Sequence, residues 1–286
     1  SKETISLFLF NLVNTSNQDI IFVTNTLYEA NKVYQSLLNY TNNVFLFPMD
    51  EFLTSEAIAI SPELKTTRIE TINNIVQVKD KKIIITHLMG LLRYLPSKEI
   101  WQNSIIEIKR NVEIKKELLV NHLFNIGYIN ETLVTKTGEM SNRGYILDVF
   151  PINENNPIRI EFFGDNVESI RYFDIDTQLS TNEIENIKIY PFNEFIVESK
   201  DNKSNQKYLP LYTTPFSILN YLNDPILVYK DYTQIKNSYF LLREEIFNYS
   251  ISKSEKNLNY MHNLEDLSSK NEIYIMGIDS ILETKN

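Results

Sequence analysis

Cysteine is absent from the 286 residues of this chain, which excludes disulfide bonds, thiol nucleophiles and thiolate metal sites. Histidine is scarce: His87, His122 and His262 lie far apart, and no two of them have the spacing of a metal-binding pair. We interpret each histidine as a surface or partly buried side chain. The sequence therefore predicts no metal site.

Glycine is also scarce, with six residues in the whole chain. A P-loop needs two glycines and a lysine at fixed spacing, because backbone N–H groups and the lysine hold the phosphates. None of the six glycines has that spacing and none precedes a lysine. The pair Asp50–Glu51 follows an apolar run as a Walker-B pair would, but without a phosphate cradle we interpret it as an acidic loop. The sequence predicts neither a catalytic residue nor a cofactor.

Long apolar runs are missing as well, since no segment reaches the about 18 apolar residues of a membrane span. The run Ile5–Val13 is interrupted by Asn11, and no small-residue cleavage site follows it, so it predicts a first helix. We expect a cytoplasmic protein without membrane contact. The formal net charge of −9 argues against a dedicated duplex-binding protein and favours a protein partner.

The first part of the chain alternates between helical and strand patterns, which predicts a parallel α/β sheet. Helical spacing is found at residues 2–14, 26–40, 63–78 and 88–95, and apolar strand patterns at 19–24, 44–47, 82–86 and 104–108. From residue 111 the pattern changes. A helix at 114–126 ends at Gly127, and strand patterns follow at 131–135, 144–150, 158–163, 167–173 and 187–189. This second part predicts a small, mainly antiparallel β domain.

The segment 198–207 has no apolar residue and is the predicted linker. After it the α/β pattern returns, with strand patterns at 226–229 and 273–276. The predicted fold class is therefore α/β, with a parallel domain formed by two chain segments, residues 1–110 and 198–286. A mainly antiparallel β (α+β) domain, residues 111–197, is inserted between them.

The strand at 158–163 has two different faces, because side chains alternate along a strand. Its isoleucines and Phe162 point to the core, whereas Arg159, Glu161 and Phe163 share the outward face. A large apolar side chain beside an arginine is unusual on a solvent face, and both residue types are common in protein interfaces. Arg143 and Arg171, on the neighbouring strands, are expected to lie near this face. The pattern supports two interpretations equally. The face is either an interaction surface, or a solubilising face on which Phe163 packs under a neighbouring loop.

The motifs around this face carry a family resemblance. RGYILDVFP at 143–151, followed by PIRIEFFGDNVESIRYFD at 157–174, resembles the UvrB-homology module. That module is shared by the excision-repair protein UvrB and the bacterial transcription-repair coupling factors. FPMDEFL at 47–53 and SPELKTTRIETI at 61–72 are similar to the first domain of the coupling factors. The resemblance covers most of residues 1–195 and is weaker from 196 to 286.

Two features of UvrB that this chain lacks distinguish UvrB from the coupling factors as its relatives. UvrB has a P-loop in its first domain and a long tyrosine-rich hairpin that clamps DNA, and this chain has neither. Both absences match the N-terminal region of the coupling factors, in which the helicase-like first domain is degenerate. The resemblance therefore implies a non-catalytic N-terminal fragment, with the RNA polymerase-binding domain and the translocase motor outside this chain.

The resemblance also implies a partner and a site. In the family the β domain docks UvrA, the damage sensor of excision repair. The family's contact positions correspond to Arg143, Arg159 and Phe163, with Glu161 and Arg171 as flanking candidates. We expect the two guanidinium groups of Arg143 and Arg159 to bind carboxylates of the partner and Phe163 to supply an apolar anchor.

Further partners follow from the same resemblance. RNA polymerase and DNA are expected to bind the full-length protein through domains absent here, and a C-terminal domain is expected to cover the docking face. The module would thus link stalled RNA polymerase to nucleotide excision repair. The alternative is a UvrB-type DNA helicase or damage-binding subunit with its own nucleotide or DNA binding.

Overall fold

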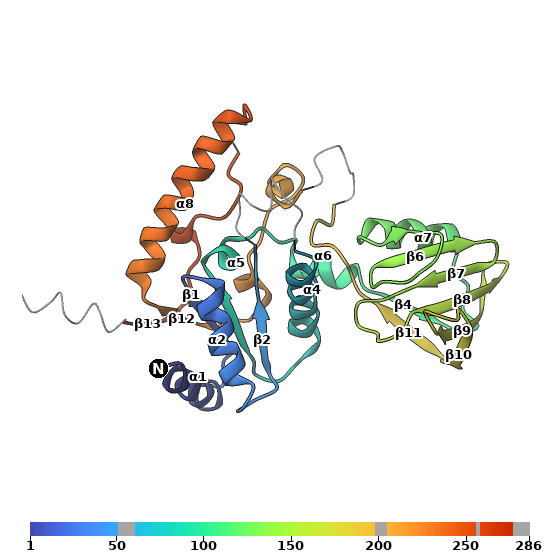
Figure 1. Ribbon diagram of the computed structural model, residues 1–286, viewed down its shortest axis with the longest axis horizontal. Helices are drawn as coiled ribbons and strands as arrows, with labels where there is room; N and C mark the ends of the chain where they lie inside the picture. Colours follow the sequence, from blue (N-terminus) through green and yellow to red (C-terminus); the bar gives the residue numbers. More distant parts are fainter. Residues whose placement is uncertain (51–60, 198–204, 256–257, 277–286) are drawn as a thin grey trace, which may run out of the picture. The chain divides into compact units, whose positions relative to one another are not determined.

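The computed structural model describes residues 1–50, 61–197, 205–255 and 258–276 (Figure 1). The chain divides into two compact units. Unit 1 consists of Ser1–Ser97 and Asn205–Asn286, and unit 2 of Lys98–Ser204. Among the described residues, no helix has the length and apolar character needed to span a membrane.

Unit 1 is built on a parallel five-stranded sheet with the order β13-β12-β1-β3-β2. Its strands are β1 (Ile20–Thr24), β2 (Val44–Phe47), β3 (Ile83–His87), β12 (Ile226–Lys230) and β13 (Asn271–Ile275). Figure 1 shows β1, from the blue start of the chain, in the same sheet as β12 and β13 from its orange-red end. The central strands are continuous apolar runs because both of their faces are buried.

Helices surround this sheet. They are α1 (Lys2–Ser16), α2 (Leu27–Leu37), α4 (Pro62–Gln77), α5 (Leu88–Leu92) and α8 (Tyr232–Ser252), with 3₁₀ helices η1 (Gln206–Leu211), η2 (Ile218–Tyr221) and η3 (Leu264–Asp266). One core joins Leu9 and Val13 of α1, Val33 of α2 and Phe22 of β1. The start of α4 follows a local rule: Ser61 accepts a hydrogen bond from the N–H of Leu64, and Pro62 occupies the first turn.

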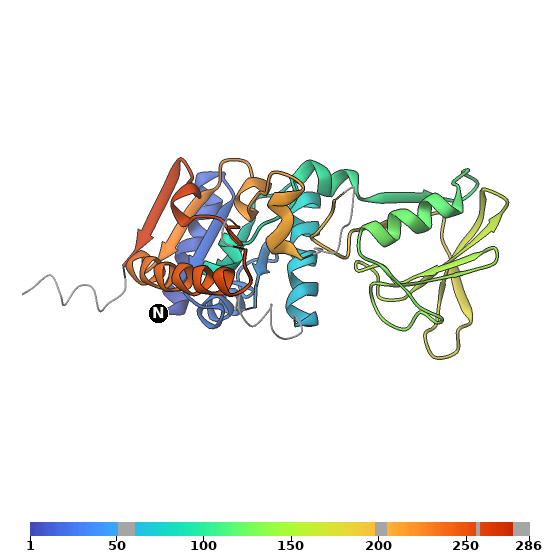
Figure 2. The same ribbon diagram turned by 90° about the horizontal axis from the view of Figure 1, so that it is seen from above.

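Unit 2 contains a six-stranded sheet with the order β10-β9-β8-β7-β6-β5 and a separate pair of strands, β4 and β11. The strands are β4 (Ile106–Lys109), β5 (Ile129–Asn130), β6 (Glu139–Arg143), β7 (Ile146–Val149), β8 (Ile158–Phe163), β9 (Asn166–Phe173), β10 (Ser180–Glu183) and β11 (Asn186–Ile189). The helices are α6 (Lys98–Asn103) and α7 (Lys116–Asn125). Figure 2 shows α7 along this β unit, and Leu119 and Leu123 of α7 share one core with the strands.

The structure corrects several predicted elements. The strand predicted at 104–108 does not join the parallel sheet, because β4 pairs antiparallel with β11 in unit 2. Its sequence IEIK alternates, as in a half-buried strand, unlike the fully buried strands of unit 1. The strand predicted at 131–135 is wrong. Residues 131–135 form no strand, and Val134 is buried there because it packs against Phe150 and Phe173.

Two further segments differ from the predictions. The polar strand β10 was not expected, because all four of its residues are exposed and carry no apolar signal. The predicted linker 198–207 lies partly outside the described residues, which resume at Asn205. Its last two residues belong to η1, where Lys207 is buried. Unit 2 begins at Lys98, before the boundary predicted at residue 111, because α6 and β4 belong to it.

The end of β3 makes unit 1 sensitive to acid. His87 is buried rather than partly buried, and its Nε2 accepts a hydrogen bond of 3.1 Å from the N–H of Met49. Burial lowers the pKa of His87 to about 4. In the unfolded chain this histidine is protonated below about pH 6.5, whereas in the folded chain it is protonated only below about pH 4. The unfolded state therefore binds more protons between these values, and the stability of the fold decreases as the pH falls through this window.

We expect the unfolding free energy to drop by about 2 kcal/mol between pH 7 and pH 5 through His87 alone. Denaturant unfolding followed by circular dichroism measures this drop, and His87→Gln should remove most of it. His122→Asn, in unit 2, is the matched control. A smaller dependence remains because burial also lowers the pKa of His262. An identical drop in wild type and His87→Gln would contradict this explanation.

Candidate functional site

Two β hairpins of unit 2 bring the predicted site residues to one end of the six-stranded sheet. The β6–β7 hairpin closes where Arg143 faces Ile146, and the β8–β9 hairpin closes where Phe163 faces Asn166. Because Ile146 also faces Glu161, both turns lie at the same end of the sheet. The C=O of Tyr145 accepts a hydrogen bond of 2.9 Å from the N–H of Phe162, which ties the two hairpins together.

Glycine begins both turns for a conformational reason. Gly144 and Gly164 have φ values of 51° and 61°, which residues with a side chain rarely adopt. Each is the first of two turn residues, the position at which a type II′ turn requires a glycine. The Nζ of Lys116, in the first turn of α7, also donates a hydrogen bond to the C=O of Gly144. The turns therefore hold the ends of their strands in fixed positions.

A buried carboxylate lies at the centre of the site. The side chain of Asp148, on β7, is 0% exposed and lies opposite Arg159 in the sheet register. Nε and Nη2 of Arg159 donate to Oδ1 and Oδ2 of Asp148, at 2.8 and 3.0 Å. Nη2 of Arg143 donates to the same Oδ2. Asp148 therefore carries a bidentate ion pair and a second arginine at once.

Arg159 makes a further contact inside the chain. Its Nη1 donates to the C=O of Gln178 at 3.1 Å, and its guanidinium carbon lies 4.7 Å from the ring centroid of Phe173. The side chain is only 15% exposed. The hydrogen bond to Asp148 raises the pKa of Arg159 above its usual value, so Arg159 stays charged at neutral pH.

The two arginines are bound within the chain to different degrees. We expected both guanidinium groups to bind carboxylates of a partner, but Asp148 already occupies two donors of Arg159 and Gln178 a third. Arg143 is different, because 43% of its side chain is exposed and one ion pair leaves its other donors open to solvent. Arg143 is therefore the more exposed of the two cations, and Arg159 the more fully bonded.

The flanking candidates form a second charge network. Oε2 of Glu161 accepts a hydrogen bond of 2.7 Å from Oγ of Ser169 and lies 3.4 Å from Nη1 of Arg171. Nε of Arg171 lies 3.7 Å from Oε2 of Glu183, on the unpredicted strand β10. Carboxylates therefore compensate Arg171, which limits the positive patch that we expected. Arg159 and Arg171 lie directly opposite each other on β8 and β9, where two like charges would repel. Asp148 compensates the charge of Arg159, and Glu161 and Glu183 compensate that of Arg171.

Large apolar side chains point to solvent at the turn end of the sheet. Phe163 is 79% exposed and Tyr145 is 65% exposed. The interpretation that Phe163 packs under a loop is wrong, whereas the predicted division of β8 is confirmed, with Ile158, Ile160 and Phe162 buried. Exposed aromatic side chains on well-ordered strands are typical of interfaces, because they lose little conformational freedom on binding.

Sequence reasoning missed two residues of this site. Asp148 lies in the apolar run YILDVF, and an acidic residue there signals either a strand edge or a buried ion pair. Tyr145 follows Gly144, a position that predicts a turn but not the exposure of an aromatic ring. A buried acid and an arginine on a neighbouring strand cannot be paired without the register, which explains the omission of Asp148.

Comparison with known proteins finds relatives over most of this chain. Residues 106–195 match the model of the UvrB interaction domain. A transcription-repair-coupling factor of Staphylococcus aureus (strain bovine RF122 / ET3-1) is 34% identical over 230 residues, which are 79% of this chain and 20% of that protein. The chain is homologous to the transcription-repair-coupling factors. The factor of Bacillus subtilis (strain 168) is 34% identical over 198 residues, or 68% of this chain and 17% of the relative. The factor of S. aureus (strain MRSA252) is 36% identical over 184 residues, or 64% and 16%.

The chain thus spans about a fifth of the length of these coupling factors, or less. The matched UvrB interaction domain begins at the first residue of β4 and includes every strand of unit 2. Both hairpins, the buried Asp148 and the exposed Phe163 therefore lie within the family domain. A function can therefore be proposed for unit 2 from its similarity to this domain.

Proposed function

We propose that this chain is the UvrA-recruiting module of a transcription-repair-coupling factor, a non-catalytic protein-binding region that links stalled RNA polymerase to nucleotide excision repair. The docking face consists of Arg143, Arg159 and Phe163, flanked by Glu161 and Arg171, and we add Tyr145 to it. The observation that carries the proposal is that the exposed Phe163 and the accessible Arg143 lie at the same end of one sheet, inside a region that matches the UvrB interaction domain.

The exposure and bonding of these side chains support different roles for them in the proposal. Phe163 and Tyr145 offer apolar surface that a partner can bury, and each such anchor typically contributes about 2 kcal/mol or more. Arg143 offers hydrogen-bond donors for a carboxylate of UvrA. Arg159 and Asp148 keep the strands and Arg143 in place, so we propose that they act on binding by positioning rather than by contact.

Unit 1 fits a degenerate helicase-like domain in this proposal. A P-loop NTPase places an eight-residue phosphate-binding motif between its first strand and the following helix. Here β1 ends at Thr24 and α2 begins at Leu27, so Asn25 and Thr26 form the whole connection. Two residues are too few for a phosphate cradle, which supports a scaffolding role for this sheet. Contacts with RNA polymerase and DNA, and a C-terminal domain that covers the docking face, belong to the same proposal for the full-length protein.

Isothermal titration of the purified chain with UvrA tests this function. We expect saturable binding, and Arg143→Glu should weaken it at least about tenfold because it replaces the exposed cation by an anion. Lys188→Glu, an exposed charge reversal on β11 of the same unit, is the matched control. Equal affinity of wild type and Arg143→Glu would contradict the assigned face. ATP turnover that Asp50→Asn abolishes would instead favour the UvrB-type helicase.

A further inference from the structure

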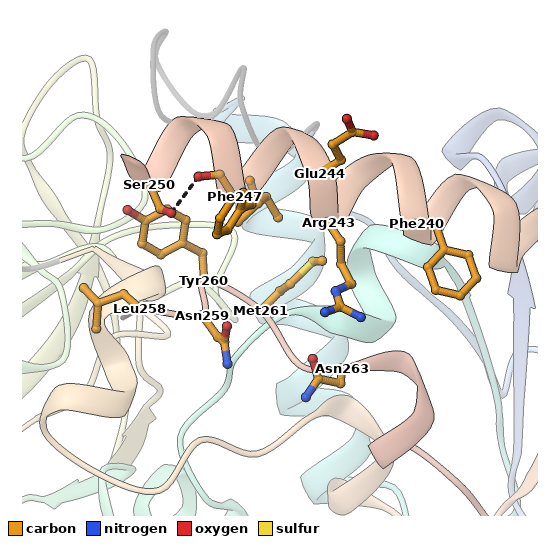
Figure 3. Close-up of a pocket in the computed structure, with 11 residues that line it drawn as sticks. Phe240, Arg243, Glu244, Phe247, Ser250, Leu258, Asn259, Tyr260, Met261 and Asn263 are labelled. Atoms are coloured by element: carbon orange, nitrogen blue, oxygen red, sulfur yellow. Dashed lines mark hydrogen bonds between the residues drawn. The ribbon is translucent and has the colours of Figure 1, made fainter. Parts of the chain in front are cut away.

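A concave surface of unit 1 lies between α8 and the segment Leu258–Asn263 (Figure 3). Its volume is about 340 Å³, which matches the lower end of ligand-binding pockets. The side chains that the argument uses are Phe240, Arg243 and Phe247 on α8 and Met261 and Asn263 on the opposite segment. We call this surface the α8 groove.

The exposed face of α8 continues the groove along the helix. Residues Lys236, Phe240, Arg243, Phe247 and Ile251 follow one another at spacings of three or four, so they form one stripe. Phe240 is 47% exposed, Phe247 59% and Ile251 41%. The buried face of the same helix uses a different set, Ile235, Tyr239, Leu242 and Ile246. The helix thus has enough apolar residues for its own core and a second apolar stripe that faces solvent.

Among the described residues, the two cations of the stripe have no acidic partner. Within the part of the chain that the structure describes, neither Lys236 nor Arg243 has a hydrogen bond or an ion pair from its side chain; the guanidinium of Arg243 lies 5.8 Å from the ring centroid of Tyr239. Figure 3 shows Arg243 pointing from α8 toward Asn263, whereas Glu244, which also lines the groove, points away from Asn263. The acid next to Asn263, Asp266, accepts a hydrogen bond of 2.9 Å from the Asn263 amide. Uncompensated cations are informative on a chain with a net charge of −9.

We propose that the α8 groove binds a peptide segment of a partner protein whose acidic side chains are interspersed with large apolar ones. Lys236 and Arg243 lie seven residues apart, or about 10 Å along the helix axis, and the aromatic ring of Phe240 lies between them. A carboxylate of the peptide pairs with each cation. Its leucine or phenylalanine side chains cover Phe240 and Phe247.

Other ligand classes fit the groove less well. A nucleic-acid strand needs a basic track along its backbone, whereas this stripe alternates cations with apolar side chains. A phosphate group needs several donors converging on one point, whereas the two cations are about 10 Å apart. An amphipathic acidic peptide satisfies both the charges and the apolar surface, as in other helix-and-groove interfaces. The inference concerns unit 1 alone and does not rest on the proposed binding of UvrA.

Selection from a phage-displayed random peptide library on the immobilised chain tests the proposal. We expect enrichment of sequences that combine Asp or Glu with Leu or Phe. Fluorescence anisotropy with the enriched peptide should show binding that Arg243→Glu and Phe247→Ser each weaken at least about tenfold. Leu241→Ser, on a neighbouring face of α8 where the side chain is 65% exposed, is the matched control and should bind like wild type. Circular dichroism of each variant checks that α8 is intact.

Several outcomes would overturn the proposal. Failure to enrich any peptide, or enrichment of neutral or basic sequences, contradicts an acidic ligand. Equal binding by wild type and Arg243→Glu, or equal binding by wild type and Phe247→Ser, places the peptide elsewhere. A concentration-dependent dimer that Phe247→Ser abolishes, seen by light scattering, would assign the groove to a second copy of the chain. Binding of a single-stranded oligonucleotide that Arg243→Glu abolishes would assign it to nucleic acid.

Discussion

Phe163→Ala is expected to weaken the binding of this chain to UvrA at least about tenfold, the proposal's largest effect on affinity. The ring is 79% exposed, so its loss removes surface for a partner without opening a cavity in the chain. It also lies at the end of β8, where the hydrogen bond between Phe162 and Tyr145 fixes the strand. The backbone at Phe163 is therefore held in place before binding, so none of the binding free energy is spent on ordering the strand.

Phe124→Ala is the matched control for this measurement. Phe124 is also a phenylalanine of unit 2, is 57% exposed, and lies in the last turn of α7 rather than at the hairpin turns. Isothermal titration with UvrA should separate the two variants, while thermal unfolding should not separate Phe163→Ala from wild type. If Phe163→Ala binds UvrA as wild type does, the assigned face is wrong. If its unfolding midpoint falls sharply, the ring has a structural role that its exposure does not suggest.

Asp148→Asn is expected to cause the largest loss of stability, about 3 kcal/mol in unit 2. The substitution keeps the shape of the side chain but removes the negative charge and one of the two acceptor oxygens. Arg159, with a side chain only 15% exposed, then keeps its charge without a counter-ion, while Arg143 can turn toward solvent. The cost comes chiefly from the charge that remains buried rather than from the hydrogen bond that is lost.

The single tryptophan makes this loss measurable. Trp101 lies in α6 of unit 2 and is fully buried, so its fluorescence reports the unfolding of this unit. The midpoint of thermal unfolding should fall by roughly 10 °C or more in Asp148→Asn. Asp165→Asn, an exposed acid in the β8–β9 turn, is the control and should match wild type. An unchanged midpoint in Asp148→Asn would show that the two arginines do not depend on this carboxylate.

Phe163→Ala and Asp148→Asn together show how a loss of UvrA binding by Arg159→Ala should be interpreted. Arg159 holds Asp148, Gln178 and the ring of Phe173, so its removal leaves Asp148 buried with Arg143 alone. A fall in affinity would then combine a disturbed sheet with any lost contact. Phe163→Ala measures contact without this disturbance, and Asp148→Asn measures the disturbance without touching an exposed group.

The sequence by itself determined the features that depend on neighbouring residues. Continuous apolar runs predict the strands β1, β2 and β3, because both faces of a central parallel strand are buried. Alternation in IRIEFF predicts that Phe163 and Arg159 share the face opposite the core, because side chains alternate along a strand. The scarcity of glycine predicts that no phosphate cradle connects β1 to α2, and the motifs around Phe163 indicate the family.

Only the tertiary structure decided which groups are paired and which are accessible. Arg143, Arg159 and Phe163 all lie on the predicted face, yet the strand register places Asp148 against both arginines and leaves Phe163 exposed. The partner of β4 is β11, which a local pattern cannot specify because many strands could complete its hydrogen bonds. Exposure depends on contacts between residues distant in sequence, whereas alternation depends on adjacent ones. The sequence therefore predicts the composition of the face, and the fold determines the role of each side chain in it.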